Sequence, residues 1–156
     1  MEGIKIILEI FNSLLSPIIA IIVTYIAYQQ WKTNKEKANR DKNAAIIDIY
    51  LVVKEFLSFI DENRKVDLQL YISFKRVIAE ADFLCEKKLV DWLENIDSEA
   101  SDWLDCDRIV QDAIEHKSPD TVKKDLDYME KNIDNLQEAH CHLLEMFKEQ
   151  IEINRK

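Results

Sequence analysis

The sequence predicts an all-α protein in which one N-terminal transmembrane helix continues into a cytoplasmic helical bundle with a long, heptad-patterned C-terminal helix. Three observations favour this architecture. The 156 residues contain one glycine and two prolines, which leaves almost no turn chemistry for β-hairpins. No charged residue occurs between positions 10 and 31. Near the C-terminus, apolar residues recur at alternating spacings of four and three, which is a heptad pattern.

Residues 10–31 form the first element. As a helix they reach about 33 Å, enough for a hydrocarbon core of about 30 Å. Thr24 interrupts the aliphatic centre, and its hydroxyl can bond back to a helix carbonyl. Pro17 is expected to kink the helix or to begin it afresh after Ser16 as a cap. A cleaved signal peptide would need a basic leader and small residues at the cleavage site, and a buried core helix rarely runs this far without a charge, so both alternatives are disfavoured.

The C-terminal end of this run has the composition of a membrane interface. Residues 32–42 hold five basic side chains against two acidic ones, whereas the preceding leader holds Lys5 against Glu2 and Glu9. By the positive-inside rule, we expect a single-pass protein of the bacterial inner membrane with a cytoplasmic C-terminal domain. The basic stretch would contact membrane lipids. The predicted interface residues are Tyr25, Tyr28, Trp31, Lys32, Lys35, Lys37 and Arg40.

Charge and hydropathy together predict three parts: a transmembrane segment over 1–31, a basic juxtamembrane stalk over 32–45 and an acidic cytoplasmic helical bundle over 46–156. The net charge is −9 for the whole chain, and residues 43–156 carry −11. An acidic domain whose basic stretch faces the membrane disfavours binding to DNA or other nucleic acids. The three cysteines are odd in number and unpatterned, which is typical of reduced cytosolic thiols.

Apolar stripes divide the bundle. They predict a helix over 46–60, a turn at 61–65, a second helix from about residue 66 and a third from about residue 89. Large aromatic side chains of the third helix are expected to fill the bundle core or an interface. These are Trp92 and Trp103.

The third helix is expected to stop early. Asp105–Asp107 interrupts its stripe, which leaves a short separate helix ending at His116–Lys117. Ser118, Pro119 and Asp120 then supply a cap residue, a helix-starting proline and a first-turn acid. A long last helix therefore begins there. Its heptad seam favours either an oligomeric coiled coil or a helix pair within one bundle. The seam residues are Val122, Leu126, Met129, Ile133, Leu136, His140, Leu143 and Phe147.

His140 is the one polar residue of that seam, and it is expected to be a hydrogen-bonded core histidine or a register-setting polar residue. The alternative is a degenerate site of the HEPN type, an all-α family that uses Arg, four to six intervening residues and His in RNA cleavage. Here Arg108 and His116 have seven residues between them, and Asn135 stands where an Arg would be wanted. Adjacent residues on a helix diverge, so His140-Cys141-His142 predicts no metal site. With no phosphate loop or nucleophile motif, we expect neither an enzyme nor a cofactor.

Residues 25–35, Tyr-Ile-Ala-Tyr-Gln-Gln-Trp-Lys-Thr-Asn-Lys, resemble a group of uncharacterised bacterial single-span inner-membrane proteins. The N-terminal span of that group ends in a similar motif and precedes a cytoplasmic helical domain. Segments 49–57 and 81–93 look like later landmarks of the group, whereas 39–45 departs from its more Arg-rich stretch. The resemblance implies an architecture and no activity.

The layout of one span, an acidic helical domain and a His without its Arg is also similar to the membrane-pore accessory protein of type VI-B CRISPR systems. That likeness implies a ring of subunits whose spans line a pore. The sequence hypothesis is therefore a homo-oligomeric inner-membrane effector that forms a pore or permeabilises the membrane in antiphage defence. One alternative is a membrane-anchored adaptor that presents the acidic domain to a cytosolic protein partner. The other is a degenerate HEPN-like domain with a residual RNA-related role.

Overall fold

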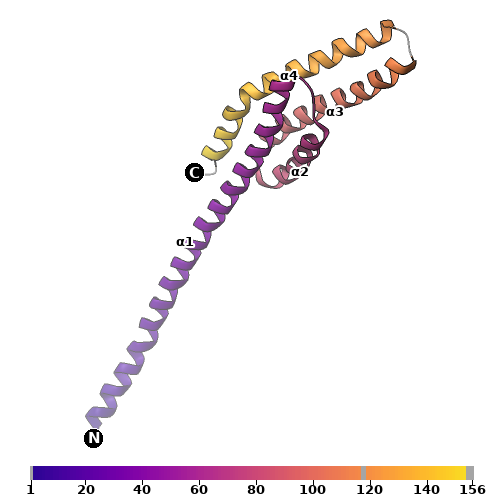
Figure 1. Ribbon diagram of the computed structural model, residues 1–156. Helices are drawn as coiled ribbons and strands as arrows, with labels where there is room; N and C mark the ends of the chain where they lie inside the picture. Colours follow the sequence, from indigo (N-terminus) through magenta and orange to yellow (C-terminus); the bar gives the residue numbers. More distant parts are fainter. Residues whose placement is uncertain (1, 117–118, 154–156) are drawn as a thin grey trace. The chain divides into compact units, whose positions relative to one another are not determined.

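The structure is a computed structural model that describes the backbone of residues 2–116 and 119–153 and the side chains of residues 3, 13, 15, 17–112 and 122–151. The described chain consists of helices without strands, which confirms the all-α class. It forms two compact units, residues 1–41 and residues 42–156. The helices are α1 (Glu2–Asn63), α2 (Leu68–Leu84), α3 (Lys87–His116) and α4 (Pro119–Ile153) (Figure 1).

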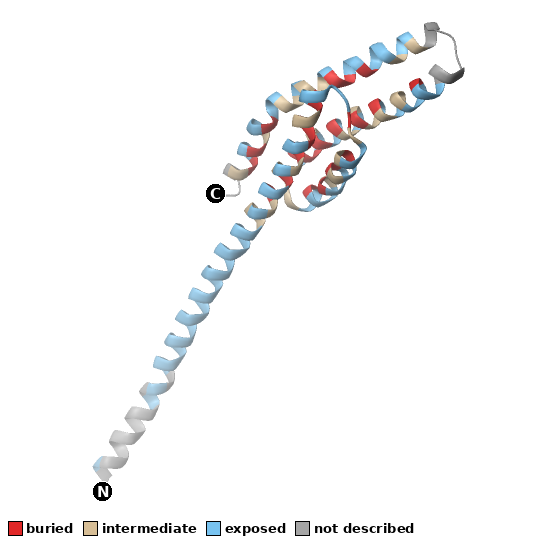
Figure 2. Ribbon diagram, in the orientation of Figure 1, coloured by how far each residue is buried: buried red, intermediate tan, exposed pale blue. Residues whose placement is uncertain are grey.

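The first unit is the N-terminal part of α1. This helix is continuous through Pro17, so of the two alternatives expected at this proline, the new helix start after Ser16 does not occur. The helix also continues through the basic stalk, because no glycine or proline lies between Thr33 and Ala45 to end it. The side chains at 17–41 are all exposed within the structure, and Figure 2 shows them as an unbroken pale blue stretch.

The apolar part of this unit was expected to span a membrane. Within the described residues, no helix offers a stretch both long and apolar enough for a membrane crossing. Positions 10–12, 14 and 16 of the predicted span lie outside the described side chains.

The second unit is built around an aromatic and aliphatic core. Phe56 of α1 is buried in this core and stacks on Phe74 of α2, with ring centroids 4.6 Å apart. Phe147 of α4 packs edge-on against Tyr50 of α1 at 5.3 Å and against Trp92 of α3 at 6.5 Å. These contacts bring all four helices to one core. The α1 residues buried there follow the predicted stripe and are Ile46, Ile49, Val53, Phe56, Leu57 and Ile60.

The turn between α1 and α2 overlaps the one predicted at 61–65, although α1 continues to Asn63 and α2 begins at Leu68. Arg64 follows the last residue of α1 with a left-handed φ of 50°, a backbone conformation that glycine usually takes at a helix end. Its guanidinium donates hydrogen bonds to Asp134 and Gln137 of α4, each at 3.0 Å, which hold the residue in place. The Asp67 carboxylate then caps α2 by accepting hydrogen bonds from two backbone N–H groups of the first turn, at 2.9 and 3.0 Å.

Helix α3 corrects one prediction. Asp105–Asp107 does not interrupt it, and no separate short helix follows. Trp103 and Val110 are seven residues apart and both are buried, so the core stripe continues across the acidic segment. The Asp105 carboxylate lies in solvent and pairs with Arg108 one turn later at 3.1 Å. Solvated carboxylates at these positions leave the helical backbone bonds intact, which is why the acidic segment does not end the helix.

Helix α4 begins at Pro119 as predicted, while Ser118 and the side chain of Asp120 lie outside the described residues. It runs back alongside α3 (Figure 1), and the Tyr128 hydroxyl donates to Asp102 of α3 at 3.0 Å. Val122 and His140 are half-buried and Leu126 is exposed. The other seam residues are in the core of the same chain and are Met129, Ile133, Leu136, Leu143 and Phe147.

Candidate functional site

The first candidate is the exposed apolar surface of α1. Aliphatic and aromatic side chains project from every side of this helix over more than four turns, and none of them is buried. A helix that is apolar all round is stable only when an apolar environment surrounds it. The exposed residues of this surface are Leu15, Ile18, Ile19, Ile21, Ile22, Val23, Tyr25, Ile26, Tyr28 and Trp31.

The predicted interface residues form a contiguous group at the end of this surface. The Tyr28 and Trp31 rings lie 6.1 Å apart, and the Lys35 ammonium lies 5.4 Å from the centroid of the Trp31 ring. Gln29 donates a hydrogen bond to the Tyr25 hydroxyl at 2.9 Å. The Tyr28 and Trp31 rings are amphipathic, and the Lys35 ammonium lies one helical turn beyond Trp31. Such side chains suit the interface between an apolar phase and water. The remaining predicted members, Lys32, Lys37 and Arg40, are exposed on the same helix.

The second candidate surrounds His140, where α1 and α4 meet. The His140 Nε2 atom lies 3.4 Å from Ser58 Oγ, and its Nδ1 atom lies 3.5 Å from Asp61 Oδ2. Gln137 donates to the other Asp61 oxygen at 3.1 Å and accepts from Arg64 at 3.0 Å. These contacts form one row of polar groups between two antiparallel helix segments. We call it the α1–α4 polar row, and its members are Ser58, Asp61, Arg64, Asp134, Gln137 and His140.

The contacts from Ser58 to His140 and from His140 to Asp61 have the arrangement of a Ser–His–Asp catalytic triad. Their surroundings, however, do not support acyl transfer. Activated nucleophiles lie about 2.6–3.2 Å from their base, and both His140 contacts are longer. Ser58 also lies inside α1, where the backbone N–H groups that would form an oxyanion hole are used within the helix. The row therefore orients His140 and connects two helices.

An RNA-cleaving role for His140 gains no support from its contacts. The arginine of the row, Arg64, bonds to Asp134 and Gln137, and reaches Glu130 at 3.7 Å, all on the α4 segment that precedes His140. Arg64 lies about seventy positions away from these residues in the sequence, so local spacing does not identify it as their partner. The sequence nevertheless indicates such a pairing, because the turn after α1 carries a basic residue and the facing segment of α4 carries acidic residues.

The other cysteine and histidine side chains that the structure describes differ in exposure. Cys141 is exposed, and His142 contacts Glu145 at 3.7 Å on its own helix. No group of three metal-ligating side chains converges in the part of the chain that the structure describes. Burial raises the pKa of the Cys85 thiol, which opposes formation of a reactive thiolate. That thiol lines an open hollow of about 500 Å³ whose other lining residues are Asp82, Lys87, Val90, Asp91 and Glu94.

These arrangements are the candidates that the described residues offer: an apolar helix with an aromatic and basic end, and a polar row that joins two helices. No family model matches the chain, and no curated protein or solved structure matches it.

Proposed function

We propose that the protein is a single-pass protein of the bacterial inner membrane and that its acidic helical domain acts by associating with other protein subunits. The observation that carries the proposal is the uncharged run at 10–31, whose described side chains are exposed. A helix of this length matches the hydrocarbon thickness of a bilayer, about 30 Å. In water the same surface would expose a row of isoleucines, which favours aggregation.

The end of the run supports an orientation with residues 42–156 in the cytoplasm. Trp31 and Tyr28 suit the headgroup region, and Lys35, which lies over the Trp31 ring, belongs to the basic stretch. Cytoplasmic loops carry an excess of Lys and Arg next to a span. Thr24 poses no obstacle to a crossing, because its hydroxyl donates to the Ala20 carbonyl at 2.7 Å and leaves no unpaired donor in the apolar phase.

The membrane anchor can be tested with a charged pair at the centre of the run. Each lysine placed there costs about 2.5–3.5 kcal/mol of insertion free energy, so the double variant Ile21→Lys/Ile22→Lys is expected to leave the membrane fraction in alkaline extraction. The control Ile47→Lys introduces a charge at an isoleucine outside the run that is 48% exposed, compared with 51% for Ile22, and it is expected to stay in the membrane. A wild-type chain that is released by alkaline extraction would contradict the anchor.

The form of activity that we propose is permeabilisation of the membrane by a homo-oligomer, in the setting of antiphage defence. One span with few polar residues cannot enclose an aqueous path, so conduction requires several subunits. The purified full chain is expected to be oligomeric in mild detergent and to release dye from lipid vesicles. A strictly monomeric chain, or vesicles that keep their dye, would refute permeabilisation.

The second candidate, a membrane-anchored adaptor, is favoured by the charge of −11 on residues 43–156. Such a domain attracts basic proteins through its overall field. Deleting residues 1–31 separates the two functions. An adaptor is expected to keep its partner after the deletion, whereas a permeabilising protein loses dye release entirely.

A further inference from the structure

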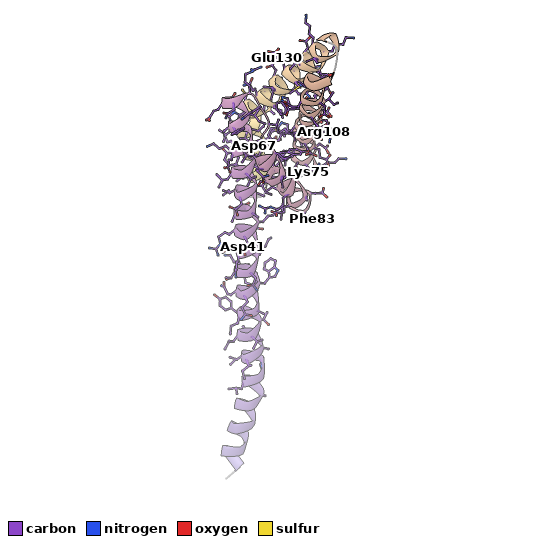
Figure 3. The ribbon with its side chains drawn as sticks, turned by 45° about the vertical axis from the view of Figure 1, so that its right-hand side comes forward. Asp41, Asp67, Lys75, Phe83, Arg108 and Glu130 are labelled. Atoms are coloured by element: carbon purple, nitrogen blue, oxygen red, sulfur yellow. The ribbon has the colours of Figure 1, made fainter. Side chains whose placement is uncertain are left out.

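Helix α2 is apolar on two opposite sides. One side packs into the core through Tyr71, Phe74, Val77 and Ala81. Phe83 lies on the other side and is 87% exposed; Figure 3 labels it near the C-terminal end of α2. A helix with a second apolar face normally has that face covered. We call this surface the outer face of α2, and its members are Leu68, Ile72, Arg76, Ala79 and Phe83.

The outer face is a continuous stripe. Its members are spaced by four, four, three and four residues, so they lie within about 80° of one another around the helix axis. Arg76 is at its middle and makes no hydrogen bond or ion pair with any described residue. Three of the six basic residues of the surrounding segment 64–88 already pair with carboxylates of α3 and α4, so the positive charge of the stripe itself is that of Arg76. The stripe therefore suits a partner that offers both apolar contact and negative charge.

Two occupants fit this stripe poorly. If two α2 helices paired about a two-fold axis, the middle of one stripe would face the middle of the other, and the two Arg76 side chains would repel each other. An anionic membrane surface would attract Arg76 and accept Phe83, but it would repel the rest of the domain, which carries −11 over residues 43–156. An acidic protein surface has neither disadvantage.

The chain itself carries such a surface on α3. Residues 91–112 hold eight acidic residues and one basic residue. Ile109 is 45% exposed, and exposed carboxylates flank it at spacings of four and three on the same side of the helix. We call this surface the acidic stripe of α3. It extends over about 32 Å, compared with about 22 Å for the outer face of α2. Its exposed members are Asp91, Glu94, Asp102, Asp105, Ile109 and Asp112.

We propose that the outer face of α2 binds the acidic stripe of α3 in a second copy of the chain. The two surfaces differ, so the contact is heterologous and each subunit can bind one neighbour through each surface. Repetition of such a contact closes a ring or extends a filament. The inference rests on the self-association in the proposed function and names the surfaces that produce it. Anchoring in one membrane raises the effective concentration of subunits, so a contact of modest affinity is sufficient for oligomerisation.

The test exploits the difference between the two surfaces. One variant, Arg76→Glu, makes the outer face of α2 acidic at its centre. The other, Asp105→Lys/Asp112→Lys, makes the acidic stripe basic on both sides of Ile109. Each variant alone is expected to associate at least tenfold more weakly than the wild type, measured as molar mass by light scattering of the full chain in mild detergent. An equimolar mixture of the two is expected to regain the wild-type mass, because each altered surface then meets a complementary one.

Matched substitutions control for charge and hydropathy. Lys54→Glu reverses an exposed charge on α1, and Leu144→Ser removes an exposed leucine of α4. Both are expected to keep the wild-type mass, whereas Phe83→Ser is expected to lower it. Variants that remain oligomeric overturn this interface but leave permeabilisation by a homo-oligomer standing, whereas a monomeric wild type overturns both. The interface is also overturned if the mixture stays dissociated, or if Phe83→Ser keeps its mass but loses binding to anionic vesicles.

Discussion

Two of the three leucines in the heptad seam of α4 are equivalent in the sequence pattern but differ in burial. Leu136 is 1% exposed within the core, and Leu126 is 49% exposed. Replacing a buried leucine by alanine costs about 2–5 kcal/mol, because the lost transfer free energy adds to that of a cavity. We expect Leu136→Ala to lower the free energy of unfolding by about 3 kcal/mol. We expect Leu126→Ala to lower it by about 1 kcal/mol, because roughly half of that side chain already contacts water.

The difference of about 2 kcal/mol corresponds to a factor of about 30 in the ratio of folded to unfolded chains. It can be measured by urea unfolding of both variants in mild detergent, followed by circular dichroism at two protein concentrations. The two variants share the same chemical change, so the comparison isolates burial. Equal losses for both leucines, with midpoints that rise with protein concentration, would show that the seam pairs with another subunit and would refute the intramolecular core.

Three further predictions concern a helix cap, a side-chain hydrogen bond and a partly buried thiol. Asp67→Ala removes the cap of α2 and is expected to cost about 1 kcal/mol in urea unfolding, whereas Asp67→Asn is expected to cost little; equal losses would argue against capping. The Gln150 side chain accepts a 2.8 Å hydrogen bond from the Glu86 backbone N–H, so Gln150→Ala is expected to cost about 1–3 kcal/mol and to speed amide exchange at Glu86. Burial raises the pKa of the Cys85 thiol, so at pH 8 iodoacetamide is expected to modify the exposed Cys141 first, with Cys85 gaining reactivity as the pH rises; equal rates at pH 8 would contradict this order.

Several features of the chain follow from local sequence. The scarcity of glycine and proline determined the all-α class, and the absence of a breaker between Thr33 and Ala45 determined that α1 continues through the stalk. Apolar spacing located the core stripe over 46–60 and the turn after it. Each of these depends on residues within a few turns of one another, which is the range over which helical periodicity acts.

The error at Asp105–Asp107 arose because an acidic segment can either end a helix or form its solvated side. Only the packing of Trp103 and Val110 into one core decides between them. The same limit applies to Arg64, which was recognised as part of a turn but not as a partner of α4.

What the sequence by itself determined is where helices form and which side of each is apolar. What only the tertiary structure decided is which apolar side is covered. Seam position 136 is buried and seam position 126 is not, Ser58 meets His140 across 82 positions, and the outer face of α2 remains open while its opposite face is in the core. The physical reason is that helix formation depends on near neighbours, whereas burial depends on which distant segment packs against a face.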